Sequence, residues 1–161
     1  MRLLAIDPGY DRCGVAVFDA TTKDPKLLHS ACITTKKTDT QETRLAVIYN
    51  ELERLVVEWN IETIALETLF FSINKKTALK VAEARGVVLL LAGTYTLEVI
   101  ELSPQEVKLA VAGSGAVDKK QVKKMVELLL KNQLQGRFDD EIDAIAIGLA
   151  GIPTLFQKKL A

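Results

Sequence analysis

Four carboxylates occupy positions in the sequence where a side chain is expected to do chemistry. Asp7 ends the short apolar run Leu3 to Ile6, and Glu67 ends a second apolar run, Ile61 to Leu66. A carboxylate at the end of a buried strand loses part of its hydration, which is costly unless a cation, a metal ion or hydrogen-bond donors compensate. Each acid also has a simpler explanation, because Asp before Pro-Gly often starts a turn and a Glu at a strand end is commonplace. Two such acids on strands that could be neighbours favour a shared site.

A second pair of acids lies where the last helix is expected to begin. Asp140 and Asp143 are three residues apart, so they share one face of a helix. Asp143 also shares that face with Ile147, four residues on, which would draw it toward the core. Acids in a first helical turn suit the helix dipole, so a purely capping role is the alternative.

The chemistry of these four acids can be inferred from what surrounds them in the sequence. Carboxylates that converge repel one another and hold protons unless divalent cations neutralise them. The single His29 and the isolated Cys13 and Cys32 cannot make a usual zinc site, and oxygen-only ligands favour Mg²⁺ or Mn²⁺. Two such ions about 4 Å apart can activate a water and stabilise the leaving oxygen in phosphodiester hydrolysis. A nuclease is the natural inference.

The charge distribution is more informative than the net charge, which is zero with 21 basic and 21 acidic residues. Basic residues gather in two runs, from Lys75 to Arg85 and from Lys119 to Lys131, while acids concentrate near Asp140. Lysines on a helix face are usually solvated surface, and this is the simpler explanation of either run alone. Where the runs flank metal-binding carboxylates, however, they could face the phosphates of a nucleic acid.

The elements expected to position these residues form one compact domain over residues 1–161, since 48% of the residues are hydrophobic and no low-complexity tract interrupts them. Nothing near Met1 looks like a leader or a membrane segment, so a cytoplasmic protein without a membrane part is expected. The order is three strands, then helix, strand, helix, strand and helices. It predicts an α/β ribonuclease H-like fold with a five-stranded mixed sheet, three antiparallel strands then parallel ones, flanked by helices. The predicted strands are at 3–6, from 15 to 18, and at 27–35, 61–66 and 97–102. The predicted helices are at 41–59, 74–96, 104–112, from 118, and from 139 to a stop before Pro153.

Two further segments have unusual composition. The helix from Asn74 to Thr96 is small or apolar on more than one face, which is typical of a helix buried in the core or in a partner. Phe70 and Phe71 follow Glu67 in an apparent loop, where they could stack on bases or pack into the core.

The sequence resembles the RuvC family of Holliday junction resolvases over nearly its whole length. Five segments carry the resemblance in the same order along the chain: Ile6 to Gly14, Leu66 to Phe71, Ala84 to Val87, Ser103 to Val122, and Asp140 to Ala146. The resemblance implies a structure-specific endodeoxyribonuclease that nicks two like-polarity strands of a four-way DNA junction symmetrically, in homologous recombination and DNA repair. It further implies a homodimer joined through the helix starting near Asn74, working with RuvA and RuvB.

The resemblance also implies roles for individual residues. The acids would bind two Mg²⁺ ions per subunit, with Mn²⁺ able to substitute, and Asp7 would bridge both ions. Phe70 matches an aromatic that stacks on bases near the crossover, and Lys108 and Lys119 match basic residues near the scissile phosphate. The predicted catalytic and metal-binding residues are Asp7, Glu67, Asp140 and Asp143, and the predicted DNA-binding residues are Phe70, Lys75, Lys76, Arg85, Lys108, Lys119 and Lys120.

The sequence departs from the family pattern in two places, and other functions remain open. Thr68 stands where Gln or Glu is common, and Tyr10-Asp11-Arg12 replaces the usual Ser-Arg-containing turn. One alternative is a YqgF-like nuclease of the same fold, directed at RNA processing. Another is a catalytically inactive scaffold that binds junctions, although a scaffold has no need of clustered acids. An actin-like phosphotransferase needs two lobes of this fold, and 161 residues supply one.

Overall fold

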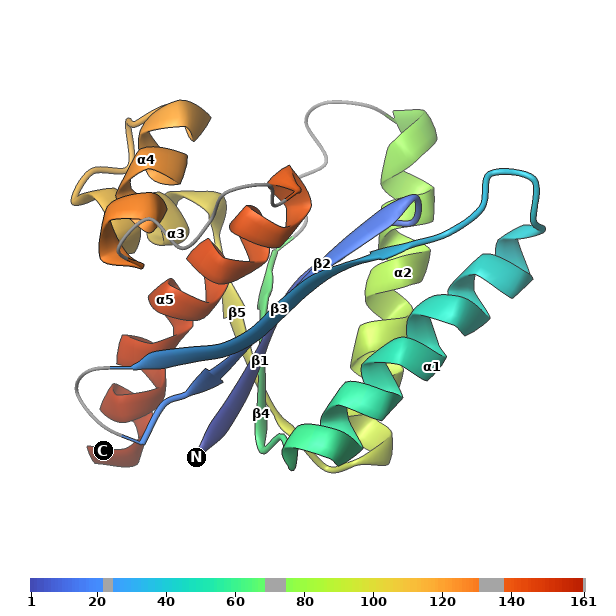
Figure 1. Cartoon of the computed structure of the whole chain (residues 1–161), viewed down its shortest axis with the longest axis horizontal. Helices are drawn as coiled ribbons and strands as arrows, with labels where there is room; N and C mark the ends of the chain where they lie inside the picture. Colours follow the sequence, from blue (N-terminus) through green and yellow to red (C-terminus); the bar gives the residue numbers. More distant parts are fainter. Residues whose placement is uncertain (22–24, 69–74, 131–137, 161) are drawn as a thin grey trace.

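A mixed β-sheet forms the centre of the computed structural model (Figure 1). The structure describes residues 1–21, 25–68, 75–130 and 138–160, without the side chains of 75–77 and 158–160. Within these residues the sheet has five strands, antiparallel on one side of β1 and parallel on the other, which confirms the predicted ribonuclease H-like arrangement. Their order is β3 (Lys26–Thr34), β2 (Arg12–Asp19), β1 (Arg2–Asp7), β4 (Thr63–Glu67) and β5 (Glu98–Leu102).

Helices cover both faces of the sheet (Figure 1). One face is covered by α1 (Gln41–Trp59) and α2 (Lys75–Thr94), and the other by α5 (Asp139–Leu160), with α3 (Pro104–Ala112) and α4 (Lys119–Leu129) beside it. Alternate residues of a strand point to opposite faces. Leu4 and Ile6 therefore pack on the side of α1 and α2, and Leu3 and Ala5 on the side of α5. Burial on both faces explains why β1 is an uninterrupted apolar run.

Capping boxes fix the starts of the two short helices. Ser103 Oγ accepts a hydrogen bond from the Glu106 backbone N–H at 3.2 Å, and the Glu106 carboxylate accepts one from the Ser103 N–H at 2.7 Å. Asp118 and Gln121 make the same reciprocal pair at the start of α4. Each pair satisfies two backbone donors that a helix start otherwise leaves free, so these ends are well defined.

Helix α5 continues through Pro153, so the predicted stop before this residue is wrong. A proline inside a helix lacks the N–H that would bond to the preceding turn, and it costs about 3 kcal/mol. Here the flanking Ile152 and Leu155 are 4% and 0% exposed in the core under the sheet. Burying two such side chains contributes about 1.5–3 kcal/mol each, which offsets the cost.

Of the described helices, none combines the length and apolarity required to cross a membrane.

Candidate active site

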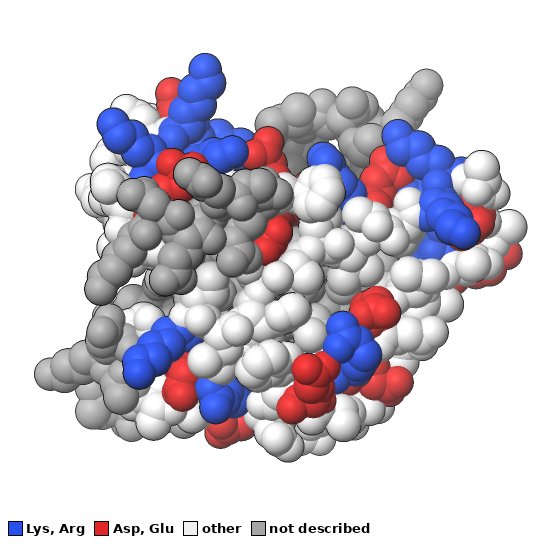
Figure 2. All heavy atoms as spheres, viewed as in Figure 1, with Lys and Arg blue, Asp and Glu red and all other residues white. Residues whose placement is uncertain are grey.

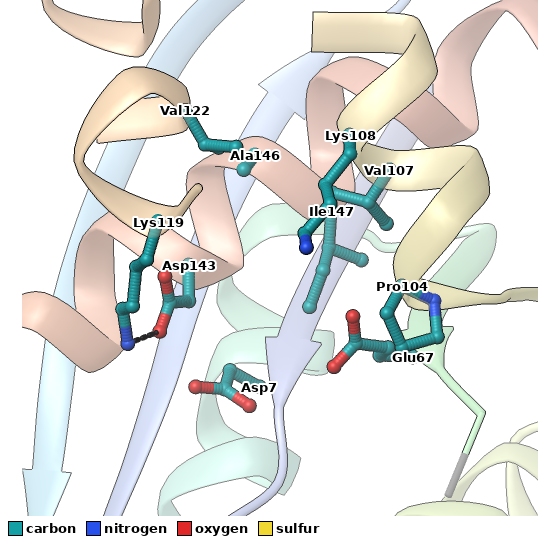
Figure 3. A pocket seen from close by; sticks show the side chains of 10 residues that line it. All are labelled: Asp7, Glu67, Pro104, Val107, Lys108, Lys119, Val122, Asp143, Ala146 and Ile147. Atoms are coloured by element: carbon teal, nitrogen blue, oxygen red, sulfur yellow. Dashed lines mark hydrogen bonds and ion pairs between the residues drawn. The ribbon is translucent and has the colours of Figure 1, made fainter. Parts of the chain in front are cut away.

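The parallel pairing of β1 and β4 brings two of the predicted acids to one edge of the sheet. Ile6 pairs with Leu66, so Asp7 and Glu67 follow at the carboxyl ends of adjacent strands. Both side chains point into the same cavity (Figure 3). The carboxyl ends of parallel strands are where open α/β sheets commonly place their ligands.

Helix α5 brings a third acid to this cavity, because its first turn lies unusually close to β2. A Cβ atom on Gly14 would lie 1.8 Å from the Asp140 backbone oxygen, so no other residue fits at position 14 as the chain lies. This approach places Asp143 over the end of β1 (Figure 3). The cavity measures about 210 Å³ and is lined by Asp7, Glu67, Pro104, Val107, Lys108, Lys119, Val122, Asp143, Ala146 and Ile147.

Asp7 is the acid whose charge is most disfavoured in this environment. Burial, followed by the negative charges of Asp143, Glu67 and Asp140, raises its pKa from 3.8 to about 7. Lys119 opposes this shift without cancelling it. A carboxylate with such a pKa is half protonated near neutral pH, so a further positive charge would be bound favourably beside it.

Two lysines partly compensate the other acids of the cavity. Lys119 Nζ donates a hydrogen bond to Asp143 Oδ2 at 2.6 Å. Burial lowers the pKa of Lys119, but the hydrogen bond and the charge of Asp143, together with the charges of Asp7 and Asp139, outweigh burial, so the pKa is raised overall. The pKa of Glu67 is raised by burial and by Asp143, while the charges of Lys119 and Lys108 lower it. The pKa of Asp143 is also raised, chiefly by burial.

Asp140 does not line the cavity, although its charge acts on Asp7, and it has a different partner. Its Oδ2 is 3.0 Å from Arg12 Nε, but it accepts no hydrogen bond from any described residue. The Arg12 guanidinium also lies 6.0 Å from the centre of the Phe138 ring. The buried Oδ2 of Asp140 is therefore held by an ion pair alone, and a bound metal ion would have to take the place of Arg12 there.

The donor set fits a hard divalent cation in its chemistry. All four predicted ligands offer carboxylate oxygens. Three of them have a raised pKa, and the fourth, Asp140, has a buried oxygen that accepts no hydrogen bond from the described residues. As the described side chains lie, no three Asp, Glu, His or Cys residues are grouped closely enough to hold one ion. A bound cation would therefore have to draw the carboxylates closer together.

The predicted DNA-binding residues have different placements. Lys108 and Lys119 line the cavity, and Lys120 is exposed beside Lys119 on α4. Figure 2 shows Lys and Arg side chains gathered over α4, at the upper left. Arg85 is only 14% exposed and is bonded to Glu101 at 2.7 Å, so its geometry favours a structural role over a phosphate contact. Phe70 and the side chains of Lys75 and Lys76 lie outside the described residues.

Two arginines beside the acids were not predicted from the sequence. Arg12, on β2, contacts Asp140 on α5, and no spacing in the sequence indicates this pair. Arg44 is 5% exposed and holds the turn that follows Asp7. It did leave a signal, because it lies four residues before Ile48, at a position of the apolar stripe of α1 where a charge is unexpected.

Comparisons with known proteins agree on one family. The family model described as "Crossover junction endodeoxyribonuclease RuvC" matches residues 3–151. A protein of that name from Alkaliphilus oremlandii (strain OhILAs) is 40% identical over 149 residues, which cover 92% of this chain and 91% of the relative. Thermus thermophilus RuvC has a similar structure, with a TM-score of 0.87 and 28% identity over 98% of this chain and 97% of that one. The same protein solved in complex with a Holliday junction substrate gives a TM-score of 0.88, at 28% identity, over 98% of this chain and 96% of that one.

Proposed function

This chain belongs to the RuvC family of crossover junction endodeoxyribonucleases, and from this premise we propose that it resolves Holliday junctions by metal-dependent hydrolysis of phosphodiester bonds. The observation that carries the proposal is the cavity between β1, β4 and α5. It combines three carboxylates, from Asp7, Glu67 and Asp143, with two lysines, Lys108 and Lys119. Carboxylates bind metal ions and lysines bind phosphate. This pocket could therefore present metal ions and lysines to the same phosphodiester group.

The cofactor we propose is Mg²⁺, two ions per subunit, with Mn²⁺ able to substitute. Asp7 would be shared between the two ions, because the charges of all three other acids act on it and raise its pKa. Glu67, Asp140 and Asp143 would complete the ligand set. Ions held there activate a water and stabilise the leaving oxygen of a phosphodiester.

The lysines of the cavity would bind and orient the substrate. Lys119 is bonded to Asp143 in this structure, so it must exchange this carboxylate for a phosphate oxygen when DNA and metal bind. Lys108 lines the same cavity and would hold the scissile phosphate from the side of α3. The apolar Val107, Val122 and Ile147 line the rest of the cavity and limit the access of bulk water. We further propose that Phe70 stacks on bases at the crossover, and that Lys75, Lys76 and Lys120 contact the DNA backbone.

The proposal includes a homodimer joined through α2. This helix packs Val88 and Leu91 into the core on one face and exposes Leu79 and Leu90 by 69% and 63% on the other. Apolar side chains as exposed as these, gathered on one helix, are typical of a protein–protein contact. Two subunits would cut two like-polarity strands of one junction, in the cytoplasm and together with RuvA and RuvB. The single domain over residues 1–161 is part of the same proposal.

The experiment that tests this function compares three substrates. A synthetic four-way junction, a linear duplex and an RNA–DNA hybrid are each incubated with Mg²⁺, with Mn²⁺ and with a chelator. We expect paired, symmetric nicks in the junction alone, abolished by the chelator. Cleavage of the hybrid would favour an RNA-directed nuclease of the same fold, and tight junction binding without any cleavage would favour a non-catalytic scaffold.

A matched pair of variants separates the site from the rest of the protein. Asp7→Asn keeps the size of the side chain but removes its charge, and we expect it to abolish cleavage. Asp19→Asn makes the same change at the far end of β2, where Asp19 pairs with Arg2, and should leave cleavage unchanged. Near-normal cleavage by Asp7→Asn would contradict the proposed site.

A further inference from the structure

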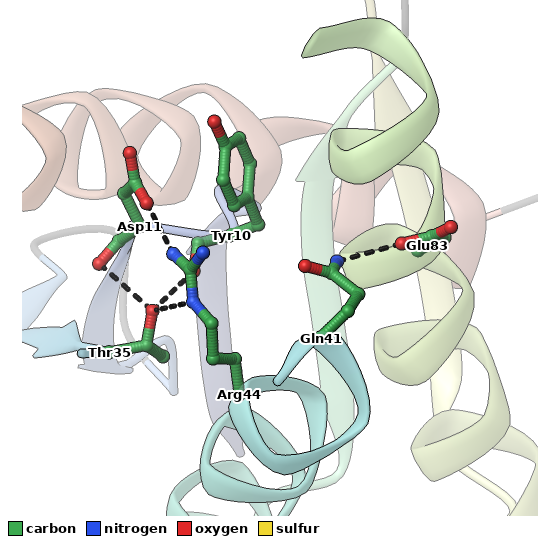
Figure 4. Close-up of polar contacts among 6 residues, drawn as sticks. All are labelled: Tyr10, Asp11, Thr35, Gln41, Arg44 and Glu83. Atoms are coloured by element: carbon green, nitrogen blue, oxygen red, sulfur yellow. Dashed lines mark hydrogen bonds and ion pairs between the residues drawn. The ribbon is translucent and has the colours of Figure 1, made fainter. Parts of the chain in front are cut away.

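A buried arginine lies behind the proposed metal site, on the opposite face of the sheet from α5. The side chain of Arg44, on α1, is only 6% exposed. Its Nε donates a hydrogen bond to the Thr35 hydroxyl at 2.9 Å, and its Nη2 donates one to the Tyr10 backbone oxygen at 2.9 Å (Figure 4). Nη2 also pairs with the Asp11 carboxylate. One guanidinium thus joins α1 to the β1–β2 turn and to the end of β3.

These contacts leave the turn little freedom. The Thr35 hydroxyl donates a hydrogen bond to the Tyr10 backbone oxygen at 2.6 Å. The Thr35 backbone N–H donates one to the Asp11 backbone oxygen at 3.1 Å. Two cations lie close to the Tyr10 ring, with Arg44 Cζ at 4.8 Å and Lys80 Nζ at 4.9 Å from its centre. Lys80 belongs to α2, so both helices on this face of the sheet hold the turn.

The turn connects directly to the acid at the centre of the cavity. Only Pro8 and Gly9 separate Asp7 from Tyr10, and a Cβ on Gly9 would lie 2.1 Å from the Arg12 backbone oxygen. The connection is therefore short and tight. A shift of the turn would be passed on to Asp7, while Glu67 and Asp143 lie on other elements and would stay in place.

We propose that Arg44 is a positioning residue for Asp7. It acts through the Tyr10 backbone oxygen and the Asp11 carboxylate, and it holds the Asp7 carboxylate where Asp7 can share a cation with the acids of β4 and α5. The inference rests on the proposed function, because it takes Asp7 as a metal ligand. It assigns to Arg44 an effect on metal affinity that an arginine serving only stability would not have.

The test uses two variants of the network and one control. Arg44→Lys keeps the charge but cannot reach Tyr10, Asp11 and Thr35 at once, since an ammonium lacks the fork of a guanidinium. Thr35→Val is close in shape and removes only the bridging hydroxyl. Arg54→Lys is the matched control, because Arg54 lies on the same helix and pairs with Glu51 and Glu58, away from the turn.

Metal affinity is the deciding measurement, and it is made by titrating each protein with Mn²⁺ in the absence of DNA. We expect Arg44→Lys to bind Mn²⁺ about 10-fold more weakly, the low end of the effect of groups that support a metal ligand. Thr35→Val should show a smaller loss in the same direction, and Arg54→Lys none. In junction cleavage kcat should fall with KM nearly unchanged, and excess Mn²⁺ should restore kcat.

Each outcome is decisive. Unchanged Mn²⁺ affinity in both network variants, with or without a lower melting temperature, would overturn the positioning role and leave Arg44 a structural residue. Should Arg44→Lys fail to fold, Thr35→Val decides by the same criterion. Wild-type protein that binds no Mn²⁺ and cuts no junction would overturn the proposed function itself, and the inference with it.

Discussion

At the scale of single residues, Asp7 connects the electrostatics of the site to the stability of the whole chain. Its pKa is raised to about 7 in the folded protein, against 3.8 for an ordinary Asp. The folded state therefore keeps a proton that the unfolded chain loses. The contribution of this bound proton to the free energy of unfolding is fully present below about pH 4 and is lost as the pH rises through 7.

We therefore predict that the metal-free protein becomes less stable between pH 4 and pH 7. At about 1.4 kcal/mol per pH unit the loss amounts to a few kcal/mol, and Asp7→Asn should remove most of it. The measurement is thermal unfolding in chelator across this range. Adding Mn²⁺ at pH 8 should raise the melting temperature of the wild type. The same addition should raise the melting temperature of Asp7→Asn much less. Parallel curves for the two proteins in chelator would contradict the assigned shift.

Lys119 gives a second prediction at this scale. If it exchanges Asp143 for a phosphate, Lys119→Gln should weaken junction binding and lower the slope of log affinity against log salt by about one unit. Binding is measured with Ca²⁺ in place of Mg²⁺, to separate it from cleavage. Lys26→Gln, at the exposed start of β3, is the control. An unchanged slope for Lys119→Gln would place this lysine away from the DNA backbone.

The residues that the sequence identified and those it missed differ in a physical way. Asp7 and Glu67 could be found because a charged residue at the end of an apolar run can be recognised in the sequence itself. Arg12 could not be found, because its partner Asp140 is reached only across the packed sheet and helix. Arg44 is an intermediate case: its position in the apolar stripe is visible, but its partners depend on how the turn folds.

At the scale of elements, the contact between β2 and α5 determines where Asp143 lies. Gly14→Ala would place a methyl carbon 1.8 Å from the Asp140 backbone oxygen, so the first turn of α5 must move away. We predict a destabilisation of about 1–3 kcal/mol, typical of overpacking, together with a large loss of cleavage. Chemical denaturation and junction cleavage are the measurements.

The control for this prediction is a glycine that lies on a helix, in open space. Gly93 has no atom within 4 Å of the position of an added Cβ, and it lies inside α2. Gly93→Ala should therefore stabilise the protein by about 0.5–1 kcal/mol through helix propensity. Equal stability of Gly14→Ala and the wild type would show that α5 can shift without cost.

The sequence predicted the elements well, and its one clear error is instructive. Strand order and helix positions follow from local periodicity, and the predicted helix over 41–59 matches α1. The predicted stop before Pro153 failed because proline is a local signal, whereas Ile152 and Leu155 are held by the sheet above them. Tertiary burial, which no local pattern contains, decided where α5 ends.

At the scale of the whole molecule, α2 presents an apolar face that the proposed dimer would cover. We predict that Leu90→Glu converts the dimer to a monomer, because a charge there would be buried without a partner. Sedimentation velocity measures the change, and paired nicking should be lost together with the dimer. Leu128→Glu is the control, since Leu128 is 57% exposed on α4, on the other side of the sheet. An unchanged sedimentation coefficient for Leu90→Glu would place the dimer contact elsewhere.

The wide spacing of the acids along the chain has a consequence during protein synthesis. A ribosome releases Asp7 early and Glu67 later, and both can reach one sheet edge once β1 and β4 pair. Asp143 arrives only with α5, which also covers the face of the sheet formed by β1 and β2. A nascent or prematurely terminated chain that lacks α5 thus has neither a complete cavity nor a covered core. With the proposed site, a chain that ends before α5 lacks both Asp140 and Asp143, and we expect such a chain not to cut DNA.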